Sequence, residues 1–211
     1  MPAHDFILDP VVLSFFQKEG IETVLDIGCG YGLFGYMIRM EKDFKGELIG
    51  MDAYPPYIEK LKRHSGAVYD SLVIADARHL PFKSGAVDTV LASEVIEHLP
   101  KEGGMALIGE AERVGRKLTL FTTPRGYLPQ ETHDGNDLEA HLSGWSERDF
   151  ADRGYGIVYA GSVQMMVKKS RLRGLLGAVN AALGFLPPTI KKKLPKYEMI
   201  AFKELDRERG K

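Results

Sequence analysis

A glycine turn near the N-terminus constrains the fold of this chain more than any other stretch. Residues 24–27 read as a short buried strand, and glycines follow at positions 28, 30 and 32. Apolar residues then resume at helical spacing over residues 33–38. A strand, a glycine turn and a helix N-terminus together form a nucleotide cradle, because backbone N–H groups point outward and glycine lets a ligand approach closely.

Asp26 separates the two kinds of ligand that use such a cradle. Gly30, Gly32 and Gly35 satisfy the dinucleotide pattern G-x-G-x-x-G, but two residues separate the first of them from the expected strand end. A carboxylate just before the turn would repel a pyrophosphate and would favour an ammonium or a sulfonium group. S-adenosylmethionine carries both groups.

Length and composition indicate a single domain over residues 1–211. The formal net charge of −1 gives no sign of a nucleic-acid partner. Cys29 is the only cysteine, which fits a reducing compartment. No signal-peptide pattern and no long apolar run is present, so we expect a cytoplasmic protein without a membrane-spanning helix.

Strand and helix patterns alternate along the chain, which predicts a parallel sheet covered on both faces. Two late strands, without a long helix pattern between them, indicate an antiparallel edge. The expected strands span 24–27, 46–52, 68–75, 87–92, 117–121, 157–167 and 198–205, and the clearest expected helices span 55–61, 101–114 and about 146–152.

Polar residues stand at the expected ends of four strands: Asp26, Asp52, Asp76 and Ser93. In an open α/β sheet, ligands bind outside the carboxyl ends of the strands. Asp52 lies about twenty residues past the glycine turn, where an acid holds ribose hydroxyls. Asp76 precedes an apolar stretch, where a carboxylate could meet an adenine amino group.

The motifs VLDIGCGYG, GMDAY, IADARHLPF and VDTVLASEVIEHLP, in this order and spacing, resemble those of class I S-adenosylmethionine-dependent methyltransferases, most closely the small-molecule "type 11" group. The resemblance covers about residues 20–165. It implies a Rossmann-like three-layer sandwich whose seven-stranded, mostly parallel sheet has an antiparallel last strand. The cofactor-binding residues that we expect are Asp26, Gly28, Gly30, Asp52, Ala53, Asp76, Ala77 and Ser93.

The sequence after the fourth strand bears on the methyl acceptor. The Asp/Asn-Pro-Pro-Tyr motif of nucleic-acid and protein amine methyltransferases is absent, and residues 92–95 read ASEV instead. We therefore expect a small-molecule or lipid-like acceptor. Two other functions compete with this one: a nicotinamide-dependent oxidoreductase, and a non-catalytic protein that binds S-adenosylmethionine.

His98 and His141 are the expected catalytic residues, with His98 as the general base. Glu94, Glu97 and His98 would share one face of a helical turn. The pattern Glu-x-x-Glu-His resembles a metal-binding motif of quinone O-methyltransferases and small-RNA 2′-O-methyltransferases. We expect no metal; these three residues would bind one if it were present, with His133 or His141 as a further ligand.

Two further stretches extend the expected site. In the polar region 122–144 and just beyond it, Arg125 would pair with an anionic acceptor, and Trp145 would line the pocket or pack in the core. Residues 168–196 form a basic amphipathic insertion with eight lysines and arginines and no acidic residue. Such a segment either packs on the domain over the substrate pocket or lies on an anionic membrane surface.

Overall fold

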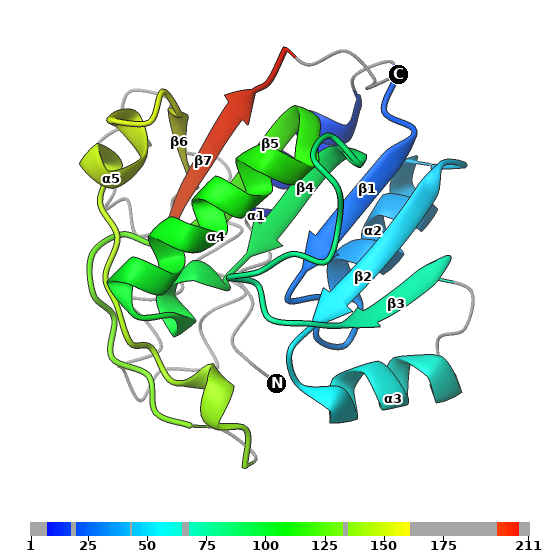
Figure 1. Ribbon diagram of the computed structural model, residues 1–211, viewed down its shortest axis with the longest axis horizontal. Coiled ribbons are helices and arrows are strands. Elements are labelled where there is room, and N and C mark those ends of the chain that lie inside the picture. Colours follow the sequence, from blue (N-terminus) through cyan, green and yellow to red (C-terminus); the bar gives the residue numbers. More distant parts are fainter. Residues whose placement is uncertain are drawn as a thin grey trace, which may run out of the picture.

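The computed structural model of the chain describes residues 8–17, 20–42, 44–64, 68–132, 135–160 and 198–206. Within them, one seven-stranded sheet has the strand order β3-β2-β1-β4-β5-β7-β6 (Figure 1). Its strands are β1 Thr23–Ile27, β2 Glu47–Asp52, β3 Ser71–Ile74, β4 Val87–Ser93, β5 Gly115–Pro124, β6 Gly156–Ala160 and β7 Glu198–Glu204.

The four pairs β3–β2, β2–β1, β1–β4 and β4–β5 are parallel, whereas β7 runs antiparallel to both of its neighbours, β5 and β6. The predicted sheet, mostly parallel with an antiparallel last strand, is therefore confirmed. Because β7 inserts between β5 and β6, the last strand is internal to the sheet and β6 forms its edge. The predicted insertion at residues 168–196 lies outside the described residues, and so do His133 and the expected strand beyond Ala160.

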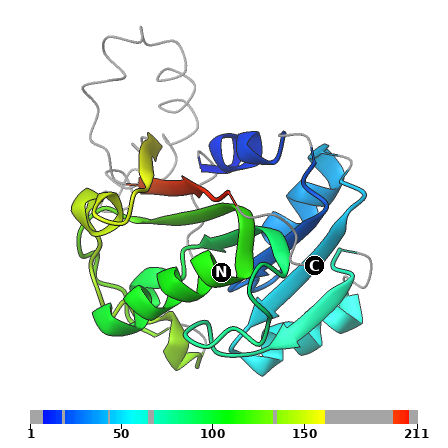
Figure 2. The same ribbon diagram turned by 45° about the horizontal axis from the view of Figure 1, so that its top comes forward.

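Helices cover both faces of the sheet (Figures 1 and 2). The helices are α1 Leu8–Ser14, α2 Leu33–Lys42, α3 Pro55–His64, α4 Lys101–Val114 and α5 Glu147–Ala151, with 3₁₀ turns η1 Phe15–Gln17, η2 Ile96–His98 and η3 Asp137–Glu139. The apolar residues of α1, α2 and α3 pack in one core cluster, and those of α4 pack in the other. This arrangement is the predicted three-layer sandwich.

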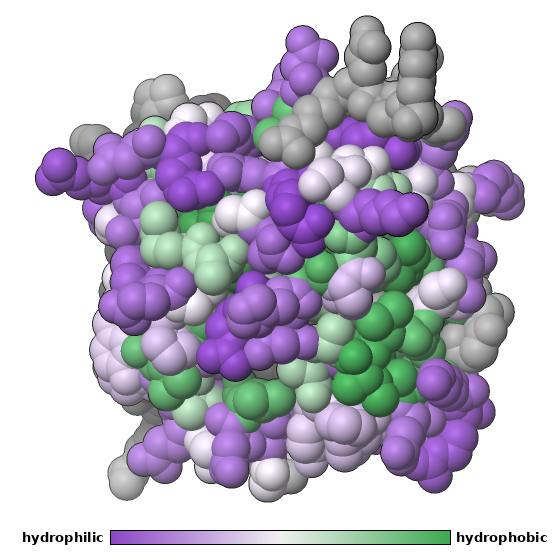
Figure 3. Space-filling model, viewed as in Figure 1, coloured by the Kyte–Doolittle hydropathy of each residue, from purple (hydrophilic) through white to green (hydrophobic). Residues whose placement is uncertain are grey.

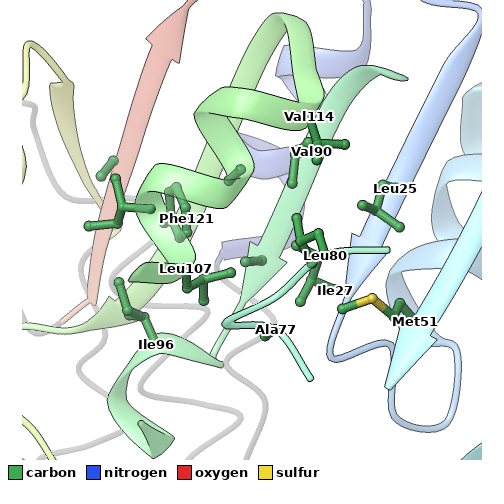
Figure 4. Packing of buried hydrophobic residues seen from close by; sticks show 14 of the residues in the cluster. Leu25, Ile27, Met51, Ala77, Leu80, Val90, Ile96, Leu107, Val114 and Phe121 are labelled. Carbon is green, nitrogen blue, oxygen red and sulfur yellow. The ribbon is translucent and has the colours of Figure 1, made fainter. Parts of the chain in front are cut away.

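The core cluster that contains the apolar residues of α4 packs this helix against the sheet (Figure 4). Leu107 and Val114 of α4 are completely buried there, and Phe121 of β5 is 1% exposed. Trp145, from the loop before α5, is also completely buried in this cluster. Of the two interpretations of Trp145, the structure supports core packing. The loop that carries this residue is thereby fixed over the N-terminal end of α4.

The outer surface is mostly hydrophilic in the view of Figure 3, with a group of hydrophobic residues over β3, the edge strand next to β2. Ile74, the last residue of β3, is 51% exposed. Among the described residues, no helix is both long and apolar enough to cross a bilayer.

Candidate active site

The predicted strand-end residues share one edge of the sheet. The register pairs Ile27 with Met51 and with Ala92, so that the carboxyl ends of β1, β2 and β4 are level. Ser93 in turn pairs with Thr122 of β5. Asp52, Ser93 and the glycine turn after β1 therefore lie at the edge where α/β proteins bind their ligands.

The glycine turn after β1 is fixed by main-chain hydrogen bonds. The N–H groups of Gly28 and Cys29 both donate to the carbonyl oxygen of Met51, at 2.7 and 3.0 Å. Gly28 and Gly30 have φ angles of 69° and 51°, in the left-handed region that favours glycine. The turn is thus tied to β2, the strand that ends at Asp52.

The two glycines differ in what surrounds them. A Cβ atom built on Gly30 would have the carbonyl oxygen of Gly28 as its nearest neighbour, at 3.9 Å, which leaves space for a ligand. A Cβ atom on Gly28 would lie 2.3 Å from a methyl carbon of Val95. The side chain of Val95 therefore fills the space on the Cβ side of Gly28, and the cofactor contact expected at Gly28 stays a prediction that concerns its main chain.

Asp52 connects this turn to α3. Its carboxylate accepts hydrogen bonds from the N–H groups of Gly30, at 2.9 Å, and Tyr54, at 2.8 Å. Burial of this carboxyl group raises its pKa, and the nearby Glu139 adds to the effect. Ala53, between the two anchored positions, is exposed at the same edge.

Asp26 is buried behind the glycine turn and does not face solvent. It is 2% exposed, and its carboxyl group accepts a hydrogen bond of 2.5 Å from the hydroxyl of Tyr69. Burial raises the pKa of Asp26 to about 7. Tyr69 was not among the residues expected from the sequence, because it lies 43 positions away.

Asp76 and Ala77 follow β3. The guanidinium of Arg78 donates to both carboxylate oxygens of Asp76, at 2.6–3.0 Å, and this pairing holds the pKa of Asp76 below its usual value. Ala77 belongs to the core cluster with Leu80 (Figure 4). Asp76, whose side chain is 41% exposed, is thus the member of this pair that faces solvent.

Hydrogen bonds between side chains link the ends of β4 and β5. The Oγ of Ser93 lies 2.8 Å from the Oγ1 of Thr122, which donates to Glu94 at 2.7 Å. Glu94 has a φ angle of 52°, the only positive value of a residue other than glycine in the described ranges. Such strained backbone concentrates at functional sites.

This backbone turn corrects one geometric expectation. Because Glu94 adopts a left-handed conformation and η2 begins only at Ile96, Glu94 does not continue the helical face of Glu97 and His98. The structure instead brings His141, from the long polar loop, to Glu97 and His98. The possible ligand atoms of these three residues all lie within 4.8 Å of one another.

His98 and His141 form an edge-to-face pair, with ring centroids 4.8 Å apart. The Nδ1 atom of His98 lies 3.2 Å from the carbonyl oxygen of Ala140, and that of His141 lies 2.6 Å from the carbonyl oxygen of Leu128. A carbonyl oxygen only accepts, so each Nδ1 carries the proton and each neutral ring keeps its lone pair on Nε2. Burial lowers the pKa of both histidines, which favours the neutral form.

Glu97 holds the polar loop against η2. Its main-chain carbonyl accepts from the N–H groups of Leu142 and Ser143, at 2.8 and 3.1 Å. Its side chain is different: the residue is 2% exposed, and neither carboxyl oxygen has a hydrogen-bond partner within the described part of the chain. Burial, with the charge of Glu94 nearby, raises the pKa of Glu97 well above its usual value.

The polar loop also contacts α3. Glu139, in η3, accepts a hydrogen bond from the hydroxyl of Tyr57. Tyr57 packs against Tyr31 of the glycine turn, with ring centroids 4.5 Å apart. Sequence reasoning missed this connection, since Tyr57 and Glu139 are 82 positions apart. Arg125, expected to meet an anionic acceptor, pairs with Glu147 at 2.6 Å.

A family model described as a methyltransferase domain matches residues 24–117. One curated relative is the malonyl-[acyl-carrier protein] O-methyltransferase of Legionella pneumophila, 35% identical over 132 residues, or 62% of this chain and 43% of the relative. Another is the ubiquinone biosynthesis O-methyltransferase of Pectobacterium atrosepticum, 27% identical over 150 residues, or 60% of this chain and 61% of the relative.

Among solved structures, phosphoethanolamine N-methyltransferase 2 of Haemonchus contortus, solved with S-adenosylhomocysteine, superposes with a TM-score of 0.58. It is 14% identical, and the alignment covers 96% of this chain and 53% of that one. This chain spans only 43–64% of the lengths of the curated relatives that it matches. These comparisons agree with the predicted fold and with the resemblance to methyltransferases, which the family model supports over residues 24–117.

Proposed function

We propose that this chain, whose residues 24–117 match a family model described as a methyltransferase domain, transfers a methyl group from S-adenosylmethionine to a small-molecule or lipid-like acceptor. The observation that carries the proposal is the juxtaposition of Gly30 and Asp52. The glycine leaves open space where the carboxylate approaches the turn, at the ligand-binding edge of the sheet.

The proposed cofactor contacts follow the edge from β1 to β4. Gly30, with the main chain of Gly28, faces the methionine part, and Ser93 at the end of β4 lies beside them. Asp52 binds the ribose hydroxyls and Ala53 lies next to it. Asp76 and Ala77 border the adenine. Asp26 acts from behind the turn, where its buried carboxylate favours the positive charges of the ammonium and sulfonium groups.

The leaving group of this reaction needs little acid assistance from the protein. The acceptor atom attacks the methyl carbon, the carbon–sulfur bond breaks, and its electron pair stays on sulfur as a neutral thioether. Positioning of the acceptor in line with that bond therefore supplies much of the rate. The chain's contribution is the rigid edge formed by β1, β2 and β4, together with the loop that Glu97 holds in place.

An oxygen acceptor fits the other side of the site. Both curated relatives described above carry O-methyltransferase names. A hydroxyl must lose its proton when it is methylated, and His98 and His141 offer Nε2 lone pairs because their Nδ1 atoms donate to backbone carbonyls. Arg125 is paired with Glu147, so an anionic acceptor is not expected to depend on it.

The test is binding of S-adenosylmethionine, S-adenosylhomocysteine and NAD, measured by calorimetry. We expect the first two ligands to bind. Asp52→Ala should weaken binding by about 1–3 kcal/mol, because hydrogen bonds to a charged group are lost. Asp152→Ala removes an exposed acid at the end of α5 and should leave the affinity unchanged.

Each competing function has its own outcome. Binding of NAD without S-adenosylmethionine would show a nicotinamide-dependent oxidoreductase. Cofactor binding without formation of S-adenosylhomocysteine in the presence of any of a panel of phenols, carboxylic acids, amines and thiols would favour the non-catalytic alternative.

A cytoplasmic location, with membrane contact through residues 168–196, completes the proposal.

A further inference from the structure

We propose that Glu97, His98 and His141 bind a divalent transition-metal ion on the acceptor side of the site. The expectation from the sequence was that no metal is bound. The binding itself depends only on these three residues, whereas its role in catalysis rests on the proposed methyltransferase function.

The first argument is the isolation of the Glu97 carboxyl group. The residue is 2% exposed, and neither oxygen makes a hydrogen bond of ordinary geometry among the described residues; the nearby Thr123 hydroxyl offsets only part of the rise in its pKa. A buried carboxylate without a partner is costly, and native proteins pair such groups or use them to coordinate metals. Its ligand atom lies within 4.8 Å of one on each of the two histidines, so a cation placed among the three would satisfy it.

The second argument is the orientation of the two imidazoles. Both Nδ1 atoms are held by backbone carbonyls, those of Ala140 and Leu128. Metal-binding histidines characteristically donate their other ring N–H in this way, which fixes the tautomer and the ring orientation. Nε2 is then the ligand atom that each ring presents.

The third argument is that the main chain fixes the three residues relative to one another. Glu97 and His98 are consecutive in η2, and His141 is joined to them through the hydrogen bonds from Leu142 and Ser143 to the Glu97 carbonyl. Ligand atoms bound at about 2.0–2.2 Å from a common ion lie roughly 3–4 Å apart. The present ligand atoms, all within 4.8 Å of one another, are close to that spacing.

The donor set selects the class of ion. Two imidazole nitrogens and one carboxylate oxygen suit Zn²⁺, Mn²⁺, Fe²⁺ or Co²⁺, whereas Mg²⁺ and Ca²⁺ prefer oxygen ligands alone. Three protein ligands also leave a coordination position open. With the ion bound, the Nε2 atoms of His98 and His141 would be ligands and no longer bases. The ion would instead lower the pKa of an acceptor hydroxyl at the open position, which would lose its proton to solvent before its oxygen attacks the methyl carbon.

The experiment titrates the metal-free protein with Co²⁺ and records its visible absorption, with Zn²⁺ competition and Mg²⁺ as a contrast. We expect one ion per chain, displacement by Zn²⁺, and no competition from Mg²⁺. Glu97→Gln and His141→Ala should each weaken Co²⁺ binding at least tenfold. His64→Ala changes an exposed histidine of α3 and serves as the matched control.

A second measurement guards against unfolding of the variants. Glu97→Gln removes an unpaired buried acid, so the metal-free variant should melt no lower than the wild type, while the rise in Tm on adding Zn²⁺ should be lost. No stoichiometric binding, or binding unchanged in Glu97→Gln, would overturn the site. Cofactor binding without metal binding would reject this inference alone, and metal binding without cofactor binding would reject the methyltransferase function alone.

Discussion

Asp26 is a buried acid whose protonation responds to its surroundings. Burial raises its pKa from 3.8 to about 7 in the folded protein. Between these values the folded state binds a proton that the unfolded state has released, so the free energy of unfolding falls as pH rises from about 4 to about 7. The pKa difference corresponds to at most about 4 kcal/mol.

We therefore predict that Asp26→Asn, which cannot ionise, stabilises the ligand-free protein more at pH 8 than at pH 5. Urea unfolding at the two pH values measures the difference. Asp152→Asn, at an exposed position, should retain the pH dependence of the wild type. Equal pH dependence in Asp26→Asn and wild type would show that Asp26 does not titrate in this range.

His98 is predicted to act on the acceptor and not on the cofactor. In His98→Ala, we expect turnover to fall by about 10²–10⁴-fold, the range typical of a lost acid–base group, while the affinity for S-adenosylmethionine changes little. Steady-state kinetics and calorimetry on the same preparation measure both effects. A parallel fall in turnover and cofactor affinity would instead indicate a structural role.

At the scale of elements, α4 carries glycines with opposite roles. A Cβ atom on Gly104 would lie 2.2 Å from the ring of Trp145, whereas one on Gly109 would meet only a guanidinium nitrogen of Arg153, at 4.0 Å. Alanine is favoured over glycine in a helix by about 1 kcal/mol. At Gly104 that gain is outweighed, because Trp145 is completely buried and its indole cannot move freely.

We predict that Gly104→Ala destabilises the protein by about 1–3 kcal/mol through overpacking, and that Gly109→Ala stabilises it by up to about 1 kcal/mol. Urea unfolding of both variants checks the opposite signs. Similar stabilisation by both substitutions would mean that Trp145 can repack, and the loop over the end of α4 would then be less rigid than the structure indicates.

The elements were predictable to the extent that local patterns determine them. The helix expected at 101–114 matches α4, and the strands expected at 87–92 and 198–205 match β4 and β7 within a residue or two. These segments have strong apolar periodicity, which depends only on neighbouring residues. The strand expected at 68–75 is shorter in the structure, because β3 pairs only along its four residues 71–74.

The site was predictable in outline, since strand ends place Asp52, Asp76 and Ser93 at one edge. What the sequence could not reveal are contacts between distant segments. Val95 fills the space beside Gly28, and Tyr69 reaches Asp26 across 43 positions. The replacement of Glu94 by His141 in the Glu–His cluster likewise depends on a backbone φ angle and a long loop, neither of which has a local pattern.

At the scale of the whole molecule, the sheet topology locates Ala160 and Glu198, the two described residues that flank positions 161–197. Because β7 is antiparallel to β5 and β6, Ala160 at the end of β6 pairs with Glu198 at the start of β7, and Glu198 pairs with Pro124 at the end of β5. The chain therefore leaves and re-enters the sheet at the edge that holds the candidate site. A lipid-borne acceptor would enter most directly from a membrane bound near this edge.

The last prediction concerns residues 168–196 themselves. Their eight basic residues flank a leucine-rich stretch, and each cation near an anionic membrane contributes about 1 kcal/mol. We predict that the protein floats with anionic liposomes at low salt and less so at high salt, and that Lys191/Lys192/Lys193→Glu abolishes flotation. Lys45/Lys62/Lys83→Glu makes the same charge change at exposed positions elsewhere and should retain it. Flotation that is insensitive to salt, or equal in the two triple variants, would contradict the membrane assignment and leave packing over the domain as the role of the segment.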